Sequence, residues 1–191
     1  MLPRATVPLS SLLILALACT DPVTPTDAVE VSFKAAARSA FGFNGSASGF
    51  PTGAVRLTGG GSYDPATATN TVPSTTSAVG SGGFDCSATV AQGPLNGCQE
   101  GEGVRWDTVQ LLASTGFKCT GADAAKVATT SARTAVLLAD FYRAGDGIDE
   151  SFTAQMIVSE SDLAPEIPGI QTLWVQGVGC GFANGHFDGK S

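Results

Sequence analysis

The sequence predicts an all-β domain, built either as an antiparallel β-sandwich or as a small β-barrel. The clearest signal lies in residues 134–160, where two apolar, alternating segments flank an acidic turn that contains glycine. Only 14% of the chain is charged, whereas glycine supplies 24 of its 191 residues. Long exposed helices usually display paired Lys and Glu side chains. The composition therefore favours short strands and turns over helices.

The first half of the domain contains three expected strands. Residues 29–34 alternate apolar and polar side chains, as a half-buried strand does, and residues 35–50 are expected to continue in extended conformation. Residues 54–64 and 75–86 each contain a cluster of glycines. Several glycines inside strands are typical of a sharply curved sheet, such as the wall of a barrel.

The second half begins with a loop, residues 86–103, which carries Gly-Pro and Asn-Gly turn signals. Residues 104–112 then indicate a strand whose apolar face changes after Asp107, which predicts a β-bulge there. The alanine-rich residues 122–132 are expected to hold one helical turn.

Within residues 134–160, the first strand is apolar on both faces, which suits a central position in the sheet. Its apolar side chains include Leu137, Ala139 and Phe141 on one face and Val136 and Leu138 on the other. A loop marked by prolines leads to one last strand, residues 170–182. Short connections and the absence of a long helical pattern complete the all-β prediction.

The first 18 residues have the character of a signal peptide. One basic residue, Arg4, precedes an apolar run that ends Leu-Ala-Leu-Ala immediately before Cys19. That run suits a signal peptide and is shorter than the roughly 20 residues of a membrane-spanning helix. The junction resembles the lipobox of bacterial lipoproteins, in which the cysteine thiol is diacylglyceryl-modified and the chain is cut before it.

This resemblance implies an exported protein that is anchored to a membrane through lipid on Cys19. Residues 19–28 are then the lipidated cysteine and a short tether, and residues 29–191 a single all-β domain. Thr20 follows the cysteine, as in lipoproteins of the Gram-negative outer membrane, which implies a protein facing the periplasm. Ordinary secretion, with Cys19 as a free thiol, and a retained membrane anchor remain as alternatives.

Setting Cys19 aside leaves four cysteines, which in an exported chain predict two disulfides. One possible pairing joins Cys86 to Cys119 and Cys98 to Cys180, because the similar segments GFDC and GFKC place Phe and Cys on one strand face. The other joins Cys86 to Cys98 and Cys119 to Cys180. We slightly favour the second pairing, since its first loop is short and rich in turn signals.

Composition and motifs also exclude several functions. The formal net charge of −7 argues against a nucleic-acid partner. The one histidine, His186, lies near the C-terminus, where chains fray, and no Gly-x-Ser-x-Gly motif is present, so a His-based catalytic triad is not expected. The cysteines lack the spacing of a zinc site, and we predict neither a metal nor a cofactor.

A candidate ligand site involves the two tryptophans of the chain, each on an expected strand. If these strands converge at a barrel mouth, aromatic walls and a few polar groups would form a small-molecule pocket. The candidate residues are Trp106, Trp174, Arg105, Asp140, Tyr142, Gln155 and Gln176. In the competing interpretation, both tryptophans are ordinary core residues.

We therefore expect a non-catalytic envelope module that binds a small or extended ligand or a partner protein. The curved, glycine-rich strands resemble small barrels of the calycin or allene-oxide-cyclase-like kind in architecture alone, so the resemblance transfers no functional residues. One alternative is a carboxylate-dependent envelope enzyme, either an isomerase or a glycan-directed hydrolase, with a buried Asp140 as general acid. Another is a purely structural surface protein.

Overall fold

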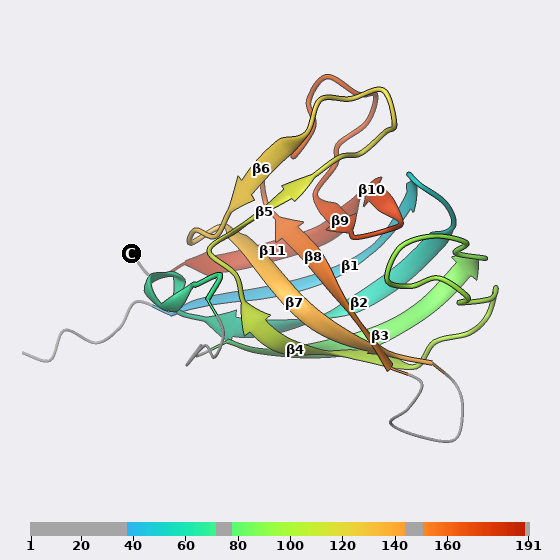
Figure 1. The fold of residues 1–191 in the computed structure, drawn as a ribbon. Coiled ribbons are helices and arrows are strands. Elements are labelled where there is room, and N and C mark those ends of the chain that lie inside the picture. The colour runs from blue at the N-terminus through green and yellow to red at the C-terminus, as the bar shows by residue number, and fades with distance from the viewer. Residues whose placement is uncertain (1–37, 72–77, 144–150, 190–191) are drawn as a thin grey trace, which may run out of the picture. The chain divides into compact units, whose positions relative to one another are not determined.

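The computed structural model describes residues 38–71, 78–143 and 151–189, which form β-strands and one short 3₁₀ turn (Figure 1). The all-β class predicted from the sequence is confirmed. The signal segment, Cys19, the tether and the expected strand 29–34 lie outside the described residues. Within the described part, no helix has the length and hydrophobicity of a membrane span.

The strands differ greatly in length, from three residues to eleven. Their bounds, in chain order, are β1 (Ser39–Gly49), β2 (Ala54–Tyr63), β3 (Val79–Ala88), β4 (Arg105–Leu111), β5 (Ser114–Phe117), β6 (Lys126–Thr129), β7 (Thr134–Tyr142), β8 (Ser151–Ser159), β9 (Leu173–Val175), β10 (Gly179–Gly181) and β11 (Ala183–Gly189). The 3₁₀ turn η1 (Pro65–Thr67) follows β2.

Eight strands close into an antiparallel barrel, so the barrel, and not the sandwich, is the architecture of this domain. They follow the order β1, β2, β3, β4, β7, β8, β9 and β10, and β10 pairs again with β1. This is the up-and-down arrangement, in which neighbouring strands are joined by local connections. β11 is an extra strand that continues along β1 beyond β10. β5 and β6 form a separate hairpin, inserted between β4 and β7.

The alternation predicted for residues 134–160 is present in β7 and β8. On β7, Leu137, Ala139 and Phe141 are buried in the barrel core, whereas Val136 belongs to a second apolar cluster on the other face. The expected irregularity after Asp107 is also present, because the pairing of β4 with β7 shifts register after Thr108.

The barrel is filled by side chains. Its largest fully buried residues come from β2, β4, β7, β8 and β9 and from the loop after β3, and they belong to one continuous cluster. They include Trp106, Tyr63, Phe141, Leu57, Leu95, Leu111, Leu137, Met156 and Leu173. The interior is therefore a packed core, as small barrels commonly have.

Trp106 is the largest of these side chains and is fully buried. Its indole N–H donates to the backbone carbonyl of Thr58, 2.9 Å away, and Phe43 packs against the ring with centroids 5.9 Å apart. Gly59 makes room for it, since a Cβ there would lie 2.7 Å from the indole ring. Gly82 allows β3 to approach β2 closely, because a Cβ at Gly82 would overlap the Thr58 carbonyl oxygen.

A disulfide and a buried hydrogen bond fix connecting segments against the barrel core. The loop after β3 packs the fully buried Leu95 into the core, and the Cys86–Cys98 disulfide joins that loop to the strand. Elsewhere, the buried Tyr63 hydroxyl donates to the carbonyl of Ser131, 2.7 Å away. Burial raises the pKa of Tyr63 to about 12, so this hydroxyl remains a donor at neutral pH.

A second, smaller apolar layer lies outside the barrel wall. The register of β7, β8, β9 and β10 places Val136, Ile157, Trp174 and Cys180 in one outward-facing row. The β5–β6 hairpin and the segment between β8 and β9 gather at this end of the molecule (Figure 1). Residues from both, including Phe117 and Ala164, pack in the same cluster as that row.

The disulfides have the second of the two pairings considered from the sequence, which we slightly favoured because its first loop is short and rich in turn signals. Cys86 pairs with Cys98, and Cys119 pairs with Cys180. The first bond lies in the barrel core, and the second joins the segment after β5 to β10. Each bond therefore fixes a connecting segment to the barrel wall.

Three local predictions are wrong. Residues 122–132 contain the strand β6 and no helical turn, because pairing with β5 overrides the alanine-rich composition. The expected final strand 170–182 is broken into β9 and β10, since Gly177 has a positive φ of 86° and turns the chain back. β11 then extends the sheet past this region, so His186 lies opposite Gly42 in a strand and not in a frayed tail.

The close approach of β2 and β3 at Gly82 predicts that alanine is tolerated less at Gly82 than at the neighbouring Gly83. Gly82→Ala should lower the free energy of unfolding by about 2 kcal/mol or more, because its Cβ would force apart the packed strands. Gly83→Ala is the matched control: its Cβ would meet only the flexible Thr58 hydroxyl, at 3.0 Å, and should cost less than about 1 kcal/mol. Denaturant unfolding of the oxidised domain measures both, and equal losses would contradict the packing described.

Candidate functional site

The two tryptophans do not converge in a barrel mouth as expected. Trp106 points into the barrel core, whereas Trp174 points outward from β9 and belongs to the second cluster. The reason is the alternation of β9, in which Leu173 and Val175 face the barrel interior and Trp174 faces away. The aromatic walls of any pocket at Trp174 must therefore come from other residues.

Three other candidate residues lie together on the outer surface of β4 and β7. The Arg105 guanidinium stacks 4.5 Å from the Tyr142 ring centroid and pairs with Asp107 at 3.1 Å. Asp140 lies opposite Asp107 in the register and accepts a hydrogen bond from the Thr153 hydroxyl at 2.6 Å. Asp140 is thus a partly exposed surface carboxylate and not an acid enclosed in a cavity, which removes the burial that the general-acid hypothesis requires.

The two glutamines of the predicted site lie together and link β5 to the barrel. The backbone N–H of Gln155 donates to Oε1 of Gln176 at 3.1 Å, and Gln176 N–H donates to the Gln155 carbonyl at 2.9 Å. The Thr115 hydroxyl on β5 donates to Oε1 of Gln155. These bonds position the hairpin over the outward face that carries Trp174.

A concave site lies between this hairpin and the barrel wall. It is a pocket of about 250 Å³, which we call the hairpin pocket. Its lining residues come from the segment after β1, from β5 and the residues around it, and from β9 with its turn. They are Phe50, Pro51, Gly116, Phe117, Lys118, Ala125, Trp174 and Gly177.

Aromatic rings give the hairpin pocket its walls. Phe117 and Trp174 have ring centroids 6.0 Å apart, and the Trp174 indole N–H donates to the carbonyl of Lys118 at 3.0 Å. Phe50 packs so close to Gly121 that a Cβ there would lie 3.0 Å from its ring. These contacts, together with the Cys119–Cys180 disulfide, hold the hairpin and hence the pocket in place.

A second hollow of about 430 Å³ lies beside the same disulfide. Both Cys119 and Cys180 line it, as do the ends of β1 and the segment before β9. Ile170 and Phe182 also line it and are 57% and 54% exposed. Large exposed apolar side chains beside a hollow are typical of interaction surfaces.

Sequence reasoning placed Trp174, Gln155 and Gln176 in a site but missed Phe50, Phe117 and Lys118. The segment GFKC did draw attention, as a possible partner of GFDC in a disulfide. A signal for the pocket was available there: Phe117 and Lys118 immediately precede a cysteine that ties its segment to a distant strand.

The described residues hold no group of three His, Cys, Asp or Glu side chains that could bind a metal ion. Comparisons with protein-family models, with curated proteins and with solved structures find no match to this chain.

Proposed function

We propose that the chain is a non-catalytic binding module of the bacterial cell envelope, with the hairpin pocket as its binding site. The observation that carries this proposal is the aromatic-walled pocket outside a barrel whose interior is already filled. Ligand sites typically combine apolar, aromatic walls with a few polar groups. Here Phe50, Phe117 and Trp174 provide the walls and Lys118 the charged group.

The rigidity of the site also supports binding over catalysis. A disulfide, the Gln155–Gln176 pair and the Trp174 hydrogen bond fix the hairpin against the barrel. A site ordered before its ligand arrives loses less conformational entropy on binding. None of the eight lining residues is a carboxylate or histidine, so the pocket lacks the side chains that most often act as general acids and bases.

We also propose that lipid on Cys19 anchors this module to a membrane, facing the periplasm in a Gram-negative cell. The support is the lipobox-like junction at residues 15–19 and the short proline-containing tether that follows. Several acyl chains are needed for stable anchoring, and lipoprotein maturation supplies them.

The proposed binding role predicts that a ligand changes the fluorescence of Trp174 and leaves that of Trp106 unchanged. Ligands from a panel of small aromatic and aliphatic acids, alcohols and amines, and short glycans, should change the fluorescence of the native domain through Trp174. In Trp174→Phe the remaining Trp106 is buried and should report no change. A ligand response retained in Trp174→Phe, or no response to any compound in the native domain, would count against the hairpin pocket as a binding site.

The anchor predicts a specific mature N-terminus. Mass spectrometry of the chain expressed in a Gram-negative host should find residue 19 as the first residue, carrying diacylglyceryl and N-acyl groups. Cys19→Ala should release the protein from membrane to soluble fractions. An unmodified native chain in the soluble fraction would refute the lipoprotein assignment.

A further inference from the structure

The charge at the hairpin pocket is supplied by one side chain. Lys118 is half-buried and lines the pocket, and its Nζ lies 3.5 Å from the carbonyl of Gly121. That distance is at the outer limit for a hydrogen bond. Its ammonium group therefore has weak local compensation within the described residues.

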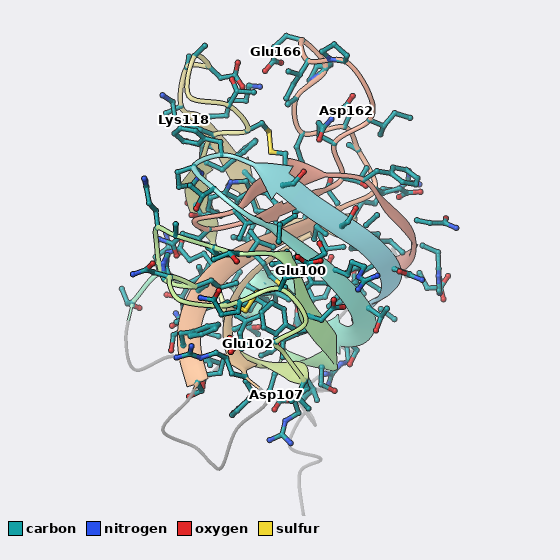
Figure 2. All side chains as sticks on the ribbon, turned by 90° about the vertical axis from the view of Figure 1, so that its right-hand side faces the viewer. Glu100, Glu102, Asp107, Lys118, Asp162 and Glu166 are labelled. Carbon is teal, nitrogen blue, oxygen red and sulfur yellow. A yellow bond between two sulfur atoms is a disulfide. The ribbon has the colours of Figure 1, made fainter. Side chains whose placement is uncertain are left out.

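Five other basic side chains in the described part have carboxylate partners. The ion pairs are Arg56–Asp85, Arg105–Asp107, Lys126–Glu166, Arg133–Glu160 and Arg143–Glu102. Lys118 takes part in none of these pairs. Figure 2 shows it at the end of the molecule that carries Glu166 and Asp162, with Glu102 and Asp107 toward the other end. Glu166 is already paired with Lys126, and Asp162 accepts the backbone N–H groups of Ala164 and Gln171.

The remaining groups of the pocket leave Lys118 as the site for a polar ligand atom. The Trp174 indole N–H is already bonded to the Lys118 carbonyl. Phe50, Pro51, Phe117 and Ala125 offer only apolar side chains. A ligand that fills the pocket must therefore be apolar over most of its surface and carry its polar group toward Lys118.

The volume of the pocket limits the apolar part. An apolar cavity of about 150 Å³ accommodates benzene, so a pocket of about 250 Å³ has room for one ring and a short chain. A cation attracts an anionic group of the ligand most strongly, and a charge-assisted hydrogen bond to a carboxylate is stronger than one to a neutral group.

We infer that the hairpin pocket binds a small amphipathic carboxylate, with one ring or branched chain among the aromatic side chains and its carboxylate on Lys118. The inference rests on the proposed binding role and adds the chemical class of the ligand. The acid occupies the pocket as a free small molecule, because the volume fits one such group and Lys118 provides one positive charge.

The probes are 3-phenylpropionate and its uncharged analogue 3-phenylpropanol, which share the ring and chain length. Isothermal titration at low salt should give a Kd for the acid at least about tenfold lower than for the alcohol. Lys118→Met should raise the Kd of the acid about tenfold and leave that of the alcohol unchanged, since methionine keeps an apolar stem and the backbone carbonyl. Lys118→Arg should restore the preference for the acid.

Arg133→Met is the matched control, because it removes one positive charge from an exposed ion pair with Glu160 outside the pocket lining. It should bind both probes like the native domain.

Equal affinity for acid and alcohol, or an unchanged Kd in Lys118→Met, would overturn the carboxylate assignment and leave the binding role standing. Binding of the acetylated peptide Ala-Ala-Phe without binding of 3-phenylpropionate would assign the site to a peptide C-terminus and overturn the small-molecule assignment. Absence of binding for all three compounds overturns the inference, and the broader fluorescence panel then decides the binding role separately.

Discussion

The fit of the Trp106 indole inside a glycine-lined wall is the constraint on which the rest of the barrel depends. The ring is fully buried, its N–H is bonded to the Thr58 carbonyl, and the absence of a side chain at Gly59 gives it space. Phe43 then packs on the ring, and Phe84 and Phe141 pack on one another elsewhere in the same core. A barrel filled in this way has a solid interior, and the proposed binding site lies outside it.

The outer apolar layer supplies the walls of the proposed binding site. Trp174 would be an exposed aromatic on a barrel wall if the β5–β6 hairpin did not cover it, and the Cys119–Cys180 bond keeps that hairpin in place. The cover is incomplete, and the hairpin pocket is the space that remains between Phe50, Phe117 and Trp174. The same disulfide therefore serves both the packing of the second layer and the shape of the proposed site.

Much of the fold could be predicted from the sequence. Alternation in β7 and β8 shows which side chains share one face of a strand, and the glycine clusters indicate where the sheet curves. Barrel closure could not be predicted, since it depends on the pairing of β1 with β10, which are far apart in the chain. The site was predicted only in part. Trp174 lines the pocket, whereas Gln155 and Gln176 hold the hairpin beside it. Phe50 joins Trp174 solely through the tertiary fold, and alternation alone does not tell which tryptophan faces the core.

Hydrogen exchange of the tryptophan indole N–H groups tests the central claim most directly. In nitrogen-15-labelled native domain transferred to deuterated water, the Trp106 signal should exchange only as fast as the whole domain unfolds, with or without a ligand present. Its burial and its bond to Thr58 require this. Exchange of Trp106 well before global unfolding would show an accessible barrel interior and contradict the account.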